Sequence, residues 1–298
     1  MNNKLNDYIK CIVTVLIAYL VSIFGSIDAL SYMGIPILTI IASISFIIHG
    51  VVFIPSYLFK TEKYFDITGT LAYIIIFITT YYLTIILHQD SPVYLRSKIT
   101  LFCISIWAIR LGLFLLIRVF RVGEDKRFRE VKKSFSKFLV YFTVSGLWVF
   151  LTTCNALTLV LNNSPLSDDL YFKFGLLFWL LGFIIEVISD EQKRHFRKDL
   201  NNKNNFIQSG LWKISRHPNY FGEIMQWIAI AIISLPVLIG WQYLTLISPI
   251  FVIMLLTKAS GINILEKNSD DKWSSNQDYI NYKKNTPVLV PFINLIKK

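Results

Sequence analysis

The sequence predicts an all-α fold, a polytopic membrane bundle of seven to eight transmembrane helices. Hydrophobic residues make up 54% of the 298 residues, and charged residues only 16%. Soluble domains carry about 25% charged residues. Apolar runs of roughly 17–25 residues recur along the chain, each long enough to cross the hydrocarbon core of a bilayer. Their short polar connections leave no room for a separate soluble domain, so we treat residues 1–298 as one integral membrane domain.

Eight runs are candidate spans. In chain order they cover 9–27, 35–59, 66–88, 99–120, 137–161, 170–189, 220–240 and 243–260. The first run lacks the small-residue cleavage site of a signal peptide and is longer than a signal-peptide core, so it reads as a retained anchor. The competing count is seven spans, with the first two misread.

The net charge of +11 is distributed along the chain in a way that indicates topology and not nucleic-acid binding. Lysine and arginine crowd the loops after the fourth and sixth spans, whereas the turns at 26–32, 162–169 and 240–242 contain neither residue. By the positive-inside rule this alternation places both termini in the cytoplasm. We assign the protein to a bacterial inner membrane. Arg96 and Lys98 are exceptions, because they lie on the predicted outer side.

A polar stripe runs along the end of the sixth span. Glu186, Asp190, Lys193 and Arg197 recur at helical spacing and therefore share one face of a continuous helix. Glu186 lies about one turn inside the apolar run, where an ionisable residue indicates a functional site. The alternative is a helix end with local salt bridges and a basic cytoplasmic flank.

A second polar stripe opens the seventh span, where Asn219, Glu223 and Gln226 share one face. Pro218 suits the first helical position. Arg216 and His217 before it make this helix start a predicted anion site, because free N–H groups and the helix dipole favour phosphate. The alternative is a simple interfacial turn. The two stripes, joined by a short polar loop, should face each other as an antiparallel pair.

The strings EVISDEQKRHFR, GLWKISRHPNYFGE, SGINILEK and YINYKKNTPVLVPF resemble the steroid 5α-reductase-like superfamily, in an uncharacterised bacterial branch. The resemblance covers 66–292, with the cofactor-binding segment at 182–230, and leaves out the N-terminal spans in 1–60. It implies a membrane enzyme that binds NADPH from the cytoplasmic side and reduces an activated C=C bond.

The resemblance also implies roles for individual residues. The positions that it implies for cofactor binding are Arg110, Arg118, Glu186, Ser189, Asp190, Arg197, Asn219 and Glu223. At the start of the seventh span, Arg216, His217 and Tyr220 are further expected cofactor-binding residues. Glu186 stands where the reductases carry an Asn, and the basic loop near GEDKRF follows the two arginines of the fourth span.

The catalytic positions depart from the family pattern. Steroid reductases hold the substrate carbonyl with a Tyr and a Glu from earlier helices, but the expected Tyr position here falls near Trp107. Asp66 and Tyr73, two turns apart on one face, are the candidate carboxylate and phenol; Asp66 as a helix N-cap is the alternative. The implied reaction is hydride transfer from NADPH to an enone-type lipid or steroid-like substrate, with these residues as donors to the developing oxyanion.

Other functions remain as alternatives. The runner-up is an S-adenosylmethionine-dependent methyltransferase of the isoprenylcysteine or phospholipid type, which shares an RHPxYxG-like segment. Polar stripes at the ends of spans, without matching halves, argue against a transporter. The four histidines have no metal-ligand spacing, so we expect no metal site. The expected partners are a hydrophobic small-molecule substrate and membrane lipid, with no nucleic acid and no obligate protein partner.

Overall fold

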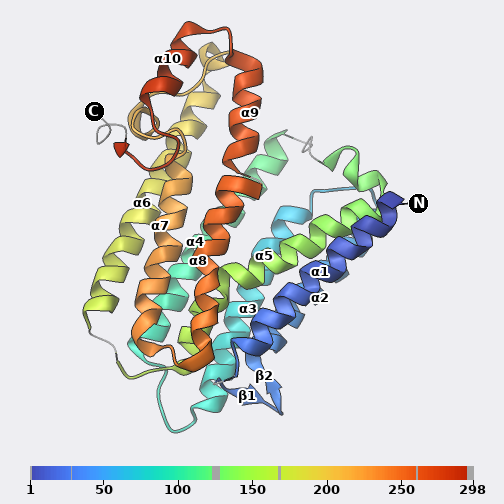
Figure 1. The fold of residues 1–298 in the computed structure, drawn as a ribbon, viewed down its shortest axis with the longest axis vertical. Coiled ribbons are helices and arrows are strands. Elements are labelled where there is room, and N and C mark those ends of the chain that lie inside the picture. The colour runs from blue at the N-terminus through green and yellow to red at the C-terminus, as the bar shows by residue number, and fades with distance from the viewer. Residues whose placement is uncertain (1, 28, 123–127, 167–168, 260, 294–298) are drawn as a thin grey trace. The chain divides into compact units, whose positions relative to one another are not determined.

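The structure is a computed structural model that describes residues 2–27, 29–122, 128–166, 169–259 and 261–293. These residues are helical almost throughout, which confirms the predicted all-α fold (Figure 1). Their contacts divide the chain into two compact units. Unit 1 contains residues 1–169 and 234–248, and unit 2 contains residues 170–233 and 249–298.

Unit 1 is built around one central helix. Its long helices are α1 (Asn2–Phe24), α2 (Ile37–Leu58), α3 (Phe65–Leu87), α4 (Leu95–Val122) and α5 (Phe135–Asn162). Helix α5 contacts the other four. It is buried from Gly146 to Leu161 with few interruptions. Short helical turns complete the unit: η2 (Val131–Lys133), η5 (Leu235–Val237) and η6 (Gly240–Leu246).

A β-hairpin with a two-residue turn joins α1 and α2. Strands β1 (Ser31–Tyr32) and β2 (Ile35–Pro36) pair antiparallel, with Tyr32 opposite Ile35. Met33 and Gly34 between them both have positive φ, 51° and 77°. This is the backbone of the hairpin turns whose twist matches that of the strands, and glycine adopts it without steric cost.

The predicted exception to the charge pattern has a local explanation. Arg96 is 1% exposed, donates from Nε to the Leu166 carbonyl at 2.7 Å, and pairs with Asp169. A buried arginine paired with a carboxylate is a packing element of unit 1 and contributes little net charge to the outer turn. The orientation of the chain in the membrane stays a prediction.

Unit 2 holds the segment that carries both polar stripes. Its helices are α6 (Leu170–Lys198), α7 (Pro218–Ser234), α8 (Ile247–Met254), α9 (Ile262–Trp273) and α10 (Gln277–Asn285), with short turns η3 (Leu200–Asn202) and η4 (Gly210–Lys213) and a π-helical turn (Leu255–Ala259). Helices α6 and α7 run side by side in Figure 1. Helix α6 extends beyond the predicted span without interruption, and α7 begins at Pro218 as predicted.

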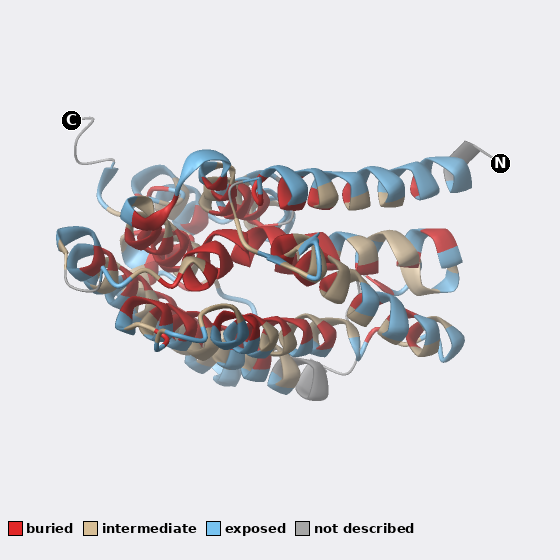
Figure 2. Ribbon diagram, turned by 90° about the horizontal axis from the view of Figure 1, so that it is seen from below, coloured by how far each residue is buried: buried red, intermediate tan, exposed pale blue. Residues whose placement is uncertain are grey.

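Eight helical stretches of the described chain are long and apolar enough to cross a membrane, which agrees with the count of eight and not with the competing count of seven. Helix α1 presents large apolar side chains to its surroundings, among them Leu5, Ile12, Leu16 and Leu20, each more than half exposed. Figure 2 shows the same exposure along the helix that starts at the N-terminus. Such a surface suits contact with lipid tails and not with water. The protein is an integral membrane protein.

Candidate functional site

Helices α6 and α7 touch through glycine. A Cβ added to Gly222 would lie 2.5 Å from the Gly182 carbonyl oxygen and 2.7 Å from the Glu186 backbone nitrogen. A Cβ added to Gly182 would lie 2.7 Å from the Gly222 carbonyl oxygen. Real Cβ atoms do not approach backbone this closely, so only glycine permits the contact. The contact brings the polar side chains one turn further along each helix within reach of each other.

The two polar stripes face each other, as predicted. Gln226 Nε2 donates to Glu186 Oε2 at 2.6 Å, and Asn219 Nδ2 donates to Asp190 Oδ1 at 3.2 Å. Glu186 is 3% exposed and Gln226 1% exposed. Each stripe thus supplies one partner of an acid–amide pair, and the pairs lie one turn apart on α6 and two turns apart on α7. Buried polar groups of this kind are retained where they are hydrogen-bonded or bind a ligand.

The rest of the predicted stripe residues surround these pairs with different degrees of exposure. Ser189 is fully buried and donates to its own helix at the Ile185 carbonyl oxygen, at 2.6 Å. Glu223 is buried and Tyr220 half-buried, whereas Arg197 is exposed on the last turn of α6. The Tyr220 ring stacks on His217 with centroids 5.8 Å apart.

Trp212 attaches the loop between α6 and α7 to α6. Its indole Nε1 donates to the Ser189 carbonyl oxygen at 3.0 Å. The Lys193 ammonium lies 4.4 Å from the Trp212 ring centroid, a cation–π contact. The Lys193 side chain therefore packs on Trp212, in the loop between α6 and α7, instead of extending into water.

Arg216 and His217 share one carboxylate, that of Glu266 on α9. Arg216 Nη1 lies 2.5 Å from Glu266 Oε2, and His217 Nε2 lies 2.8 Å from Glu266 Oε1. Lys283 on α10 lies 3.8 Å from the same carboxylate and 2.5 Å from Asp270. The predicted anion site at the start of α7 thus contains an anion that the protein itself supplies.

The C-terminal segment fastens the same turn through its backbone. Arg216 N donates to the Pro287 carbonyl oxygen at 2.9 Å, and Ser215 Oγ donates to the Leu289 carbonyl oxygen at 2.7 Å. Tyr282 on α10 donates to the Trp212 carbonyl oxygen at 2.6 Å. These contacts connect the end of the chain to the start of α7, so the position of Arg216 depends on residues about seventy positions away.

The surroundings of His217 favour its neutral form. Burial lowers its pKa below the usual value, and the hydrogen bond and charge of Glu266 oppose that effect only in part. A neutral imidazole carries one N–H, so Nε2–H donation to Glu266 makes Nδ1 an acceptor.

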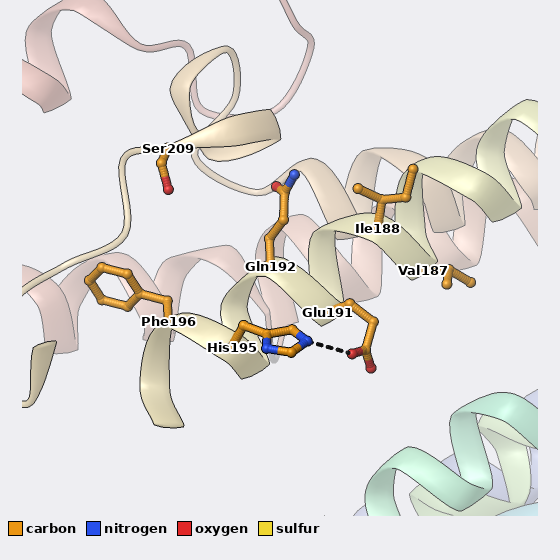
Figure 3. A pocket seen from close by; sticks show the side chains of 7 residues that line it. All are labelled: Val187, Ile188, Glu191, Gln192, His195, Phe196 and Ser209. Atoms are coloured by element: carbon orange, nitrogen blue, oxygen red, sulfur yellow. Dashed lines mark ion pairs between the residues drawn. The ribbon is translucent and has the colours of Figure 1, made fainter. Parts of the chain in front are cut away.

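A groove of about 460 Å³ lies on another face of α6 (Figure 3). It is lined by Val187, Ile188, Glu191, Gln192, His195, Phe196 and Ser209. None of these residues belongs to the predicted stripe, although all except Ser209 come from the same turns of α6. Gln192 is engaged there, because its Oε1 accepts from Leu211 N at 2.9 Å. The groove therefore does not coincide with the predicted cofactor-binding residues.

Unit 1 brings two of the predicted catalytic residues into contact. The Tyr73 and Trp107 rings pack edge to face with centroids 5.4 Å apart, and both are buried. Asp66 is half-buried in the first turn of α3. The N-cap of α3 is Tyr64, so the alternative interpretation of Asp66 as an N-cap is wrong. The other interpretation of Asp66, as the catalytic carboxylate, stays a prediction.

Of the two predicted arginines of α4, the structure describes the side chain of one. Arg110 is half-buried within the helix. Arg118 belongs to α4, but its side chain lies outside the described part of the structure, as do residues 123–127 of the GEDKRF loop. Among the described residues, no group of three or more His, Cys, Asp or Glu side chains is arranged to hold a metal ion.

The family described as "Protein of unknown function (DUF1295)" matches residues 52–286. The chain belongs to the DUF1295 family. The match begins after the first predicted span and includes every predicted site residue.

Similar curated proteins share one name. The DUF1295 chain is 27% identical to "3-oxo-5-alpha-steroid 4-dehydrogenase 1" of Rattus norvegicus over 123 residues, 41% of the chain and 42% of the relative. The protein of that name from Mus musculus is 28% identical over 125 residues, and covers 41% of the chain and 42% of the relative. That of Homo sapiens is 36% identical over 66 residues, 22% of the chain and 26% of the relative. The chain thus matches about two fifths of the rodent relatives' length, and the predicted resemblance to the steroid 5α-reductase-like superfamily is confirmed.

Two residues of this DUF1295 chain gain importance from the structure. Gln226 was part of the second stripe, but no cofactor role was predicted for it. Glu266 lies in the string SGINILEK, which supported the resemblance without a role for any one residue. Glu266 lies six residues beyond the last predicted span, in a segment that also contains Asp270 and Asp271, and no sequence signal distinguishes it from them.

Proposed function

We propose that the protein is a membrane-embedded, NADPH-dependent reductase that transfers a hydride to an activated, enone-type C=C bond of a hydrophobic lipid or steroid-like substrate. The observation that supports it most is the facing of Glu186 with Gln226 and of Asp190 with Asn219 along α6 and α7. It occurs in a family member whose curated relatives are named as steroid dehydrogenases.

The chemistry of this face suits a nucleotide cofactor. Carboxylates and amides arranged along a helix can accept from hydroxyl and amide N–H groups and donate to carbonyl oxygens. Arg197 lies nearer the end of α6 and is exposed, which suits contact with a phosphate. In this proposal Glu186, Ser189, Asp190, Asn219, Tyr220 and Glu223 hold the cofactor, which supplies the hydride when bound.

The proposed substrate-side residues belong to unit 1. A phenol or an indole N–H can stabilise negative charge that develops on a carbonyl oxygen by donating a hydrogen bond. Tyr73 and Trp107 are the candidates, with Asp66 as the proposed carboxylate. The close edge-to-face packing of the two rings limits their rotation, which keeps a donor oriented before the reaction.

Binding of NADPH to the purified full chain in detergent tests the proposal. We expect saturable binding, which Asn219→Ala and Asp190→Ala weaken by about tenfold or more, because each removes one polar partner of the Asn219–Asp190 pair. Asn201→Ala is the matched control, since Asn201 is exposed in the loop after α6. Absence of saturable NADPH binding, or equal affinity in all variants, would refute the proposal.

Binding measurements on the same purified protein also test the methyltransferase alternative. RHPNYFG is compatible with both cofactors, so the string itself does not discriminate. Saturable binding of S-adenosylmethionine without binding of NADPH would replace the reductase by the methyltransferase.

A further inference from the structure

Glu266 binds both Arg216 and His217 at the start of α7. Its two carboxylate oxygens engage Arg216 and His217 separately, at 2.5 and 2.8 Å. The three side chains are well packed: the exposed fraction is 10% for Arg216, 6% for His217 and 20% for Glu266. A carboxylate shared in this way satisfies the requirement of a helix N-terminus for negative charge.

Some hydrogen-bonding capacity is left at this turn. Among the residues that the structure describes, Arg216 Nε and His217 Nδ1 are buried and have no hydrogen-bond partner. Arg216 Nε carries an N–H and can only donate. His217 Nδ1 accepts when Nε2–H donates to Glu266. One donor and one acceptor without net charge suit a hydroxyl group or a heterocycle edge, and not a phosphate.

Lys283 does not restore positive charge to the turn. It lies 2.5 and 2.7 Å from the two oxygens of Asp270, and its contact with Glu266 is longer, at 3.8 Å. The hydrogen bond from Tyr279 to Asp270, at 2.9 Å, keeps Asp270 beside Lys283. Each base of the cluster therefore has a carboxylate partner.

We propose that Glu266 is a resident counter-ion that excludes phosphate from the start of α7, so that Arg216 and His217 receive an uncharged hydroxyl or heterocyclic part of the nucleotide. This inference rests on the proposed nucleotide cofactor and specifies how its site is divided. The phosphates then depend on other bases, of which Arg197 is exposed on α6. Glu266 is a specificity-determining residue and does not take part in the reaction.

Binding of inorganic pyrophosphate to the full chain separates this inference from the proposed function. We expect Glu266→Gln to bind pyrophosphate about tenfold more tightly than the native protein or more, because an anion next to a half-buried carboxylate is disfavoured. Glu191→Gln is the matched control, since Glu191 is also paired with an arginine, on the surface of α6. Equal pyrophosphate affinity in the native protein and Glu266→Gln overturns the inference, whether or not NADPH binds.

A second variant keeps the inference testable if Glu266→Gln does not fold. Arg216→Gln should weaken NADPH and adenosine by the same factor, because the lost contact is to an uncharged group. Loss of NADPH affinity at least about tenfold larger than the loss of adenosine affinity would show that Arg216 holds a phosphate, and would overturn the inference.

Discussion

At the residue scale, the candidate site is a set of buried polar groups whose partners come from different helices. Asp190 and Asn219, and Glu186 and Gln226, were predicted to share a face because their spacing is helical, and the structure pairs them. Arg216 and His217 were predicted at the same turn, yet their partner Glu266 lies about fifty residues away. Local spacing along one helix can be read from sequence, whereas a partner on a distant helix depends on packing.

His217 should make stability depend on pH. Its pKa is lowered in the folded state by burial, so the unfolded state binds the proton more readily. The neutral imidazole therefore contributes stability that is fully present above its unfolded pKa of about 6.5, and that is lost as pH falls through the lower folded value. We expect the melting temperature to fall between about pH 7 and pH 5, and to fall less in His217→Asn.

The control for this experiment is His195→Asn, whose side chain is 68% exposed. It should follow the native pH dependence. Identical slopes for the native protein and His217→Asn would contradict the expected link between burial of His217 and stability.

At the element scale, the contact between α6 and α7 decides where the site lies. The helices were predicted from the length of their apolar runs, and the start of α7 from Pro218. The glycines that allow the backbones to touch could be foreseen only in part: Gly182 lies one helical turn before Glu186 and so shares the face of the predicted stripe, but the role of Gly222 follows from its distance to Gly182 and Glu186. A glycine in a helix gives no sign of which neighbour it admits, because the neighbour is set by the packed structure.

Gly222→Ala should therefore separate the helices. The added Cβ meets backbone at 2.5 and 2.7 Å, which cannot move away without shifting a helix. We expect a loss of about 1–3 kcal/mol in the free energy of unfolding, as for other overpacked positions, together with weaker NADPH binding.

Gly69→Ala on α3 is the matched control. It also lies in a helix, and an added Cβ meets nothing within 4 Å. There the substitution should be neutral or stabilise by up to about 1 kcal/mol, because alanine is the better helix former. A Gly222→Ala protein as stable as Gly69→Ala would show that α6 and α7 adjust freely.

At the scale of the whole molecule, composition and hydropathy were sufficient to predict an all-α membrane protein with eight spans. The division of the chain into two compact units was not foreseen, because apolar runs show which segments cross a membrane and not which of them pack together. The substrate was not predicted either, since apolar spans suit contact with any apolar lipid and do not select one.

Topology gives a prediction at this scale. Reporters fused to both ends should lie in the cytoplasm, and Arg96→Gln should leave this orientation unchanged because Arg96 is paired with Asp169 inside unit 1. The same variant should lower the free energy of unfolding by about 3–5 kcal/mol, as when one partner of a buried ion pair is removed. Lys98→Gln, at the same turn, supplies the comparison. Opposite locations of the two reporters would refute the predicted orientation.

The glycine contact between α6 and α7 also limits how far a ligand could extend along the polar face of α6. It extends from Gly182 to Glu186 on α6, and there the two backbones leave no space between them. From Arg197 to Glu186 is about 16 Å along the helix, at 1.5 Å per residue. A ligand that lies along this face can extend over that length and no further, so we expect the face to discriminate by reach as well as by chemistry, admitting one end of a long cofactor and leaving the remainder outside.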